Sequence, residues 1–261
     1  MTAPRIAMAV AGAAALVALT GCGAISAASE RRLEFTGAEH ATFTTVIIKG
    51  GSGDVTVHSG TATGTTIKRV VRYHGDEPTS ATYRVDGSSL VLDTDCGRRC
   101  SVSYDVAMPP GVAVQGELGA GNLALTGVNS VDVEVSSGDV VINDVAGAVR
   151  ASVSSGNLSV TGGRGETTLT ASSGEVTGRH LGGPVKAEAD SGNVDLQLDQ
   201  ANSVRARVSS GSVRLAVPPG HYRVRTNGDS GSREVSVPDD PNASALIDVQ
   251  ADSGDITVRQ T

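Results

Sequence analysis

A column of oxygen-bearing side chains is the first feature of this sequence that could do chemistry. Each member follows the glycine of a repeated triplet, and half of the column is carboxylate, a ligand type that Ca²⁺ prefers. Calcium-binding β-helices use nonapeptide repeats, however, about half the spacing found in this chain. Asp and Asn also suit tight corners, so we interpret the column as turn chemistry, with Asn side chains bonding along a stack, and expect neither a metal nor a cofactor. The column consists of Asp54, Asn122, Asp139, Asn157, Glu175, Asn193, Ser212 and Asp255.

Ser230 lies in a second suggestive stretch, Gly228-Asp-Ser-Gly-Ser232, which resembles the nucleophile motif of trypsin-like serine proteases. That chemistry also needs a base His and an orienting Asp, and the protease context around the His is missing. Ala189-Asp-Ser-Gly-Asn193 and Ala251-Asp-Ser-Gly-Asp255 have nearly the same letters. We therefore interpret the motif as a repeat corner and expect no catalytic residues.

The other acids and histidines form no recognisable constellation. Glycoside hydrolysis needs two opposed carboxylates, and short regular coils leave no room for groove-forming loops. A carbohydrate-active β-helix enzyme remains the alternative to a binding protein, with its acids confined to the irregular segments. The five histidines are scattered without ligand spacing. The candidate acids are Asp76, Glu77, Asp93 and Asp95, or Asp239 and Asp240.

The start of the chain carries an export signal. Arg5 precedes an apolar run over residues 6–19, which is too short to span a bilayer. Leu19-Thr-Gly-Cys22 resembles the lipobox of bacterial lipoproteins, which implies diacylglyceryl transfer to the Cys22 sulfur and cleavage before it. Two acyl chains suffice for stable anchoring. We expect a signal peptide over 1–21, a tether over 22–32 and a protein held on the extracytoplasmic face of the membrane.

Cys96 and Cys100 enclose only Gly-Arg-Arg. With Cys22 lipidated the remaining cysteine count is even, and an exported protein meets an oxidising compartment. Zinc would need about four ligands, and no second Cys pair or nearby His pair exists. We predict a disulfide between Cys96 and Cys100 that fixes a hairpin tip.

Composition narrows the choice of partner. The formal net charge is −7, and removal of residues 1–21 loses one Arg and no acid. An acidic chain of this kind is a poor general nucleic-acid binder, because such binding needs basic charge to displace counterions from phosphates. Adhesion to an anionic bilayer through a broad basic face is disfavoured for the same reason.

The triplets themselves define the architecture that positions these residues. Between Gly121 and Gly211 the glycines recur at spacings of 17, 18, 18, 18 and 19, and apolar residues alternate with period two on both flanks. Each copy is therefore predicted to be strand, corner and strand, with glycine supplying the positive φ. One copy cannot bury its apolar face alone, so stacked copies must form a parallel β-solenoid over residues 33–261. The glycines of the corners are Gly53, Gly121, Gly138, Gly156, Gly174, Gly192, Gly211 and Gly254.

Two segments, 60–118 and 218–248, depart from this period, and the pattern allows longer coils, flanking hairpins or end caps there. The triplets, Ser103-Tyr-Asp-Val-Ala-Met-Pro-Pro-Gly111 and Val217-Pro-Pro-Gly-His-Tyr222 together resemble the DUF4097 family of bacterial β-strand-repeat proteins. The resemblance covers most of the mature chain. It implies an envelope-facing, non-enzymatic protein and supplies no catalytic residues.

We therefore expect a lipid-anchored cell-envelope protein whose solenoid works as an adhesion, scaffold or binding module. The irregular segments, with the Cys96–Cys100 hairpin first among them, are the predicted contact sites. A cell-envelope polymer or an envelope protein is the expected partner.

Overall fold

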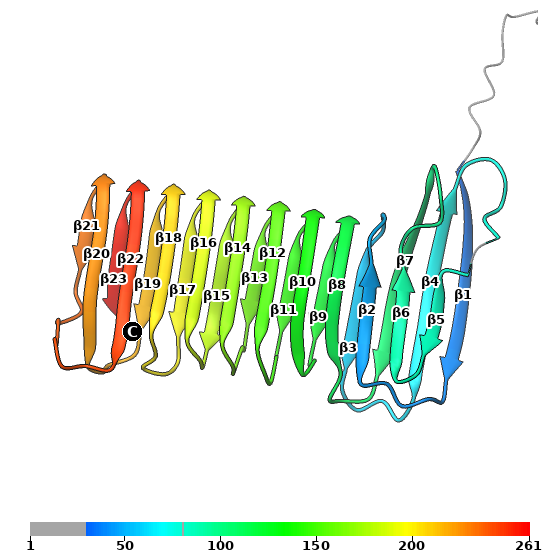
Figure 1. Cartoon of the computed structure of the whole chain (residues 1–261), viewed down its shortest axis with the longest axis horizontal. Helices are drawn as coiled ribbons and strands as arrows, with labels where there is room; N and C mark the ends of the chain where they lie inside the picture. The colour runs from blue at the N-terminus through cyan, green and yellow to red at the C-terminus, as the bar shows by residue number, and fades with distance from the viewer. Residues whose placement is uncertain (1–29, 80) are drawn as a thin grey trace, which may run out of the picture.

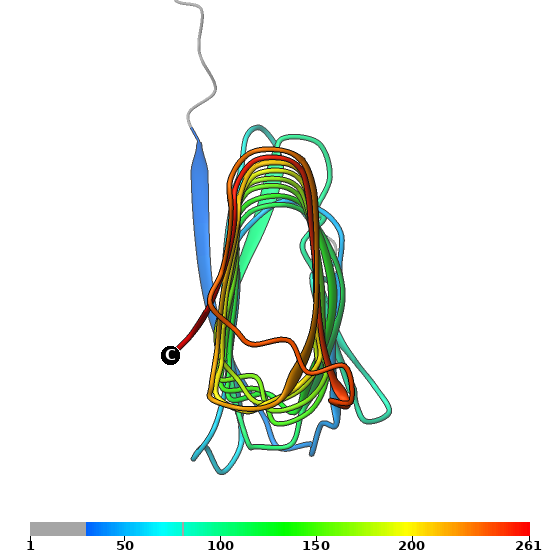
Figure 2. The ribbon, with the colours of Figure 1, turned by 90° about the vertical axis from the view of Figure 1, so that its left-hand side faces the viewer.

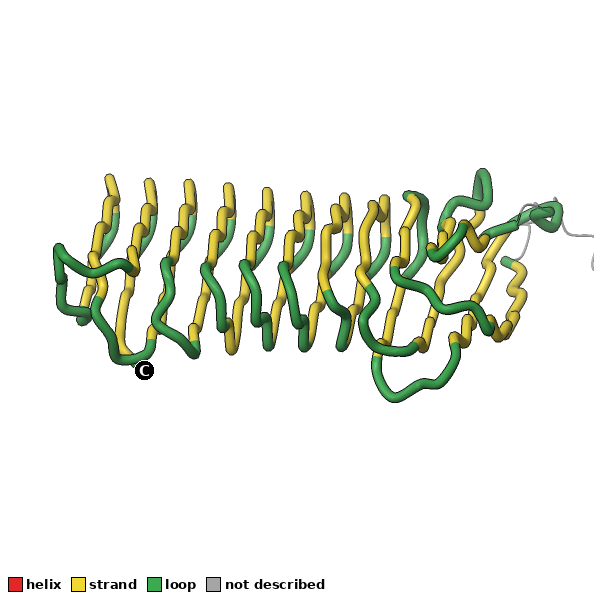
Figure 3. Tube along the Cα trace, turned by 60° about the horizontal axis from the view of Figure 1, so that its bottom comes forward, coloured by secondary structure: helices red, strands yellow, loops and turns green. Residues whose placement is uncertain are grey.

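The computed structural model describes residues 30–79 and 81–261. Over these ranges the chain forms strands and loops and no helix (Figure 3). The strands belong to two long sheets that face each other as the walls of a flattened tube (Figure 2). The predicted all-β parallel solenoid is confirmed.

The first wall, called sheet A, has 12 strands. In spatial order they are β1 (Arg31–Glu39), β4 (Thr65–Tyr73), β7 (Cys100–Met108), β3 (Val55–Ser59), β9 (Leu123–Thr126), β11 (Val140–Asn143), β13 (Leu158–Thr161), β15 (Val176–Leu181), β17 (Val194–Leu198), β19 (Val213–Val217), β23 (Ile256–Gln260) and β21 (Arg233–Val235).

The second wall, sheet B, has 11 strands. From the opposite end of the molecule they are β20 (Tyr222–Ser230), β22 (Ala245–Ser253), β18 (Val204–Ser210), β16 (Val185–Ser191), β14 (Thr167–Ser173), β12 (Val149–Ser155), β10 (Ser130–Ser137), β8 (Ala113–Ala120), β2 (Thr45–Lys49), β6 (Ser89–Asp93) and β5 (Tyr83–Asp86).

Strands β8 to β19 form the regular array, in which each coil contributes one strand to each sheet (Figure 1). Equivalent strands pair in parallel, so Val140 lies opposite Leu158 and Val153 opposite Ala171. Period-two alternation turns one side chain in two inward, and Leu123, Ile142, Leu158 and Leu169 are fully buried there. Aliphatic side chains thus fill the narrow interior without aromatic help.

The two irregular segments form the ends of the same solenoid. At the N-terminal end the β6–β7 rung lies outside the β2–β3 rung, although it follows that rung in sequence. At the C-terminal end the β20–β21 rung lies outside the later β22–β23 rung. Order along the chain and order in space therefore differ at both ends.

Within residues 30–79 and 81–261, antiparallel pairing is confined to the N-terminal end. Strand β4 lies between β1 and β7 and runs antiparallel to both, and β5 pairs antiparallel with β6. These pairs close the solenoid with sheet edges at β1 and β5 (Figure 1).

Candidate binding surfaces

The corner glycines form a column with no room for a side chain. Gly156 has a φ of +133°, and a Cβ there would overlap the carbonyl oxygen of Gly138 in the coil beneath. The same relation links Gly174 to Gly156 and Gly192 to Gly174. Backbone stacked this closely is possible only for glycine, so the glycine of each triplet is required by its neighbour as well as by its own φ.

The residues after these glycines form a hydrogen-bonded ladder, as the interpretation of turn chemistry requires. The Oδ1 of Asn122 accepts the N–H of Asp139 at 3.0 Å, and the Oδ1 of Asn157 accepts the N–H of Glu175 at 3.1 Å. The corresponding bonds run from Asn122 to Asp54, from Asn157 to Asp139, from Ser212 to Asn193, and from Ser232 to Asp255. The hydroxyl and N–H of Ser232 together lower the pKa of Asp255.

One step of the ladder is missing. The N–H of Ser212 donates to Asn193 Oδ1. Among the described residues, however, no hydrogen bond joins the side chain of Glu175 to the N–H of Asn193. Glutamate is one methylene longer than aspartate, so its carboxylate does not occupy the Asx position. No group of three or more His, Cys, Asp and Glu side chains gathers for a metal within the described ranges.

Ser230 lies at the corner between β20 and β21, where its carbonyl accepts the N–H of Gly254 at 2.9 Å. The two look-alike serines, Ser191 and Ser253, lie at corners as well, each before a glycine with positive φ. All three copies of the motif are therefore corners of the solenoid, each with the same turn geometry.

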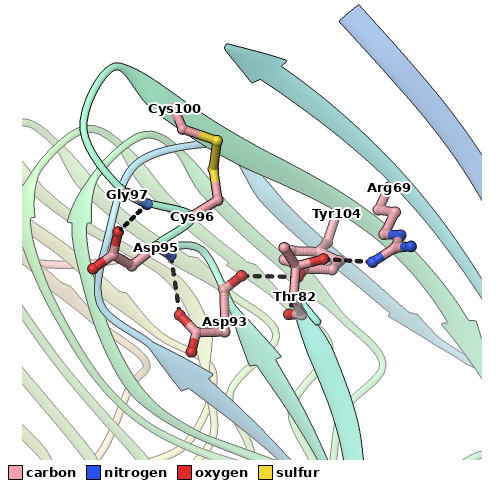
Figure 4. Close-up of a disulfide and its surroundings, with 8 residues drawn as sticks. All are labelled: Arg69, Thr82, Asp93, Asp95, Cys96, Gly97, Cys100 and Tyr104. Carbon is pink, nitrogen blue, oxygen red and sulfur yellow. Dashed lines mark hydrogen bonds between the residues drawn. A yellow bond between two sulfur atoms is a disulfide. The ribbon is translucent and has the colours of Figure 1, made fainter. Parts of the chain in front are cut away.

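Cys96 and Cys100 are joined by a disulfide, as predicted (Figure 4). The bond closes the corner between β6 and β7, the position that a Ser-Gly-polar triplet takes in the array. Because β6 belongs to sheet B and β7 to sheet A, this loop is a corner of the solenoid and not the hairpin tip that the sequence predicted. Asp95 Oδ1 accepts the N–H of Gly97 at 2.8 Å, and Asp93 Oδ1 accepts the N–H of Asp95 at 3.1 Å. Two of the candidate acids are therefore engaged in shaping this loop.

The other four candidate acids lie in two pairs at opposite ends of the solenoid. Asp239 Oδ1 accepts the N–H of Val224 at 2.8 Å, and Asp240 caps the N–H of Asn242 at 3.0 Å. Asp76 and Glu77 are exposed in the loop between β4 and β5, far along the solenoid from that pair. Asp199 and Asp240 each contact a histidine, His180 at 3.2 Å and His221 at 3.1 Å.

Sequence reasoning missed a polar cluster inside the N-terminal end. The Tyr104 hydroxyl donates to the carbonyl oxygens of Thr82 and, at 2.8 Å, Asp93 (Figure 4). Burial raises the pKa of Tyr104 to about 12. Arg69 Nη1 donates to Thr82 Oγ1 at 2.6 Å, and its guanidinium lies over Phe35 and Tyr83.

The two outer faces differ in charge over the first three coils of the array. Strands β9, β11 and β13 contain no charged residue, and their outward side chains form what we call the neutral strip. Val141, within it, is one of four exposed large hydrophobic residues described. The strip consists of Ala124, Thr126, Val141, Asn143, Ser159 and Thr161.

Sheet B carries charge at the same level of the array. The charged side chains Lys49, Glu117, Asp132, Glu134 and Arg150 line a shallow hollow of about 580 Å³ over β2, β8, β10 and β12. None of the side chains that line it is aromatic. The hollow lies on an open sheet face without loops to wall it.

A family model described as Toastrack DUF4097 matches residues 15–259. This chain belongs to the Toastrack DUF4097 family. Among solved structures, the Toastrack chain is similar to a candidate adhesin from Bacteroides fragilis NCTC 9343, with 12% identity and a TM-score of 0.54 over 90% of this chain and 99% of that one. That likeness shows the shared fold.

A candidate adhesin from Parabacteroides merdae ATCC 43184 has 13% identity and a TM-score of 0.41, over 90% of the Toastrack chain and 97% of its own. No curated protein matches the chain. Cys22 and the predicted signal peptide lie outside the described residues, and the described part contains no helix long and apolar enough to cross a membrane.

Proposed function

We propose that this Toastrack protein is a lipid-anchored module of the bacterial cell envelope whose solenoid is a non-catalytic contact surface. The observation that carries the proposal is the pair of long, unobstructed sheet faces. One of them bears a strip without charge, and the other has only an open hollow. Membership of a family whose structural relatives are called candidate adhesins supports the same class of function.

In this proposal residues 1–21 are removed, Cys22 carries the lipid, 22–32 is the tether and 33–261 is the working domain. Glu30, Arg72 and Arg99 line one pocket beside the disulfide corner, so the tether leads into the N-terminal end of the solenoid. The anchored end is then the end that holds the disulfide. The β20–β21 rung is the end away from the membrane.

Lipidation is tested by feeding labelled palmitate to cells that express the full chain. We expect label on the wild-type protein and none on Cys22→Ala. The matched control is the Cys96→Ser/Cys100→Ser double variant, which lacks the other two cysteines and should keep full label. Label retained by Cys22→Ala would refute the anchor.

The neutral strip is the proposed contact surface. Polar and apolar groups without charge can be covered by a partner at a smaller desolvation cost than ionised groups. The disulfide corner, which the sequence analysis predicted as the first contact site, lies at the tethered end. We therefore propose the side of the array as the contact surface instead of that corner.

The test is co-sedimentation of residues 23–261 with purified cell-wall polymer of the producing organism, with and without chelator. Val141→Lys/Ser159→Lys, on the strip, should abolish pelleting, whereas Ser152→Lys/Thr170→Lys, on sheet B, should not. Equal pelleting by both variants would remove the strip from the proposal. Loss of pelleting only on deletion of the disulfide corner, residues 95–100, would restore that corner as the contact site. Loss of pelleting on chelation would implicate the carboxylates that follow the corner glycines.

One observation favours the alternative, a carbohydrate-active enzyme: Glu117, Asp132 and Glu134 share the hollow on sheet B. An enzyme would release new reducing ends from the wall polymer, and Glu117→Gln or Glu134→Gln would stop the release. Absence of release by the wild-type protein, under conditions where it pellets, would reject the alternative.

A further inference from the structure

The C-terminal end of the solenoid finishes in a strand with an open edge. Strand β20 pairs with β22 on one side, and no other strand of the described residues pairs along its other side (Figure 1). An edge of this kind presents unpaired backbone N–H and C=O groups, which can accept another strand.

Only the first half of that edge is covered. The segment 236–244 crosses the end of the tube in its lower part (Figure 2). It donates the N–H of Asp240 to the carbonyl of Tyr222 at 2.8 Å and accepts the N–H of Val224 on Asp239 Oδ1 at 2.8 Å. Backbone directions alternate along a strand, so Thr226 and Gly228 present their N–H and C=O groups to the same open side.

Gly228 has one partial contact there. Arg233 Nη2 lies 3.4 Å from its carbonyl oxygen. Arg233 occupies the column that holds Val213 and Ile256 in the rungs beneath, so its side chain covers the end of the core instead of extending it. The open stretch is therefore Arg225 to Ser230.

Charges along this stretch are self-complementary in one arrangement. Arg225, Asn227 and Asp229 are exposed and alternate with the residues that face inward. Antiparallel pairing with a second copy, centred on Asn227, brings Arg225 of each copy beside Asp229 of the other. Parallel pairing in register would place like charges opposite one another, which is destabilising.

Strand β21 of sheet A offers a second contact between the two copies, at the same distance from the corner as the contact on β20. Val235, on β21, is 37% exposed and lies four residues after the corner glycine Gly231, whereas Asn227 lies four residues before it. A twofold axis through the end rung thus passes near both residues. It would bring Val235 against its own copy while β20 meets β20.

We propose that two copies of this chain pair tail to tail, through antiparallel β20 strands related by a twofold axis, into one continuous two-walled solenoid. A twofold contact is isologous, so each Arg225–Asp229 pair forms twice. The contact is limited to one end of a narrow tube, and small interfaces of this kind are typical of weak, reversible association.

The anchored ends of such a dimer point away from each other. If the lipid anchor of the proposed function is correct, the pair joins two membranes, or two sites of one envelope, at a distance of two solenoid lengths. The dimer itself does not depend on the anchor, and the test uses residues 23–261 without lipid, so either proposal can fail alone.

The experiment is sedimentation velocity over a concentration series from about 1 to about 500 µM. We expect the wild-type protein to shift reversibly from monomer to dimer. Arg225→Asp and Asp229→Arg should each weaken the association at least about tenfold, because each sets like charges together. The double variant Arg225→Asp/Asp229→Arg should restore it, and so should an equimolar mixture of the two single variants.

Arg150→Asp, on sheet B in the middle of the array, is the matched control and should dimerise as the wild type does. Dimerisation undiminished in both single variants, or a monomer at every concentration, would overturn the proposal. A head-to-tail contact between β20 and the N-terminal edge would be recognised by failure of the double variant and of the mixture to recover. Thermal unfolding of each variant, expected to match the wild type, shows that the exposed substitutions leave the fold intact.

Discussion

The regular array and the N-terminal end of this solenoid are stabilised in different ways. In the array the same kinds of interaction recur from coil to coil: parallel backbone pairing, a glycine corner, columns of aliphatic side chains that face inward from both sheets and, except at Glu175, a hydrogen bond from the corner side chain. In the N-terminal end each interaction occurs once. It holds the disulfide, the antiparallel pairs, the buried Tyr104 hydroxyl and the Arg69 stack, together with five of the six aromatic residues of the chain.

The difference shows how a solenoid begins and how it continues. A new coil added to the array finds a matching coil beneath it, so small aliphatic residues and glycine suffice. The first coils have no such template. Larger side chains and a covalent bond take its place there.

The largest effect is expected in the array, at a glycine corner. Gly156→Ala forces a Cβ into the backbone of Gly138 at a positive φ, and we expect a loss of about 3 kcal/mol or more in the free energy of unfolding, measured with urea. Gly60→Ala is the control, since a Cβ at Gly60 would meet no other atom within 4 Å and the φ there is ordinary; it should change stability by less than about 0.5 kcal/mol. A similar small loss for Gly156→Ala would show that the coils can separate freely.

Tyr104→Phe tests the singular contacts of the N-terminal end. The variant leaves the carbonyl oxygen of Asp93 without the hydroxyl donor, at a cost of about 2 kcal/mol. Tyr222→Phe, whose hydroxyl donates to the Pro218 carbonyl at 2.8 Å in the C-terminal end, is the comparison and should cost less because its contact is local.

The same tyrosine gives a pH dependence. Its pKa is raised in the folded protein to about 12, so its contribution to stability is complete below the unfolded value near 10 and is lost as the pH rises through the folded value. Burial also raises the pKa values of Tyr83 and Tyr222, so ultraviolet titration of the phenols should show several delayed ionisations, of which the latest disappears in Tyr104→Phe. Persistence of that group in the variant would assign it to another tyrosine.

Removing the disulfide should have a smaller effect. A loop of so few residues constrains the unfolded chain by about 2 kcal/mol at most in the chain-entropy description. For Cys96→Ser/Cys100→Ser we expect faster amide exchange in residues 93–104 and unchanged exchange in the array. Loss of protection in β13 or β15 would mean that the disulfide corner supports the whole stack.

The smallest effect distinguishes two steps of the corner ladder. Asn157→Ala removes the bond from the N–H of Glu175 to Asn157 Oδ1 and the longer bond from Asn157 Nδ2 to Asp139 Oδ1, and it should cost about 1 kcal/mol. Glu175→Ala removes a side chain that makes no such bond and should be nearly neutral in the same urea titration. Equal costs for the two variants would show that the ladder contributes little beyond the glycine column.

The array could be predicted from the sequence, and the order of the end rungs could not. Each coil repeats the glycine spacing and the alternation, so one coil predicts its neighbours, the parallel register and the corner bonds. The gap at Glu175 follows from its extra methylene and could also have been anticipated. At the ends, by contrast, β2 lies beside β8 and β20 beside β22, and no periodic signal states which distant strand is adjacent.

The contact surfaces show the same division. The residues of the neutral strip belong to three short segments without charge in the sequence. They form one surface only because the parallel register of β9, β11 and β13 places them side by side. The Arg69 cluster joins β1, β4 and β5, whose residues are far apart in sequence. In the sequence, the only indication of this cluster is that five of the six aromatic residues precede position 105.

The inverted order of the last two rungs has a consequence for the way this chain is made. Synthesis proceeds from the N-terminus, so the coils of the array can be laid down one upon another as they appear. The β20–β21 rung is then completed before the β22–β23 rung that must lie beneath it. A gap therefore separates the array from the β20–β21 rung until the β22–β23 rung enters it, and the two sheets become continuous only when a rung made later is inserted beneath one made earlier.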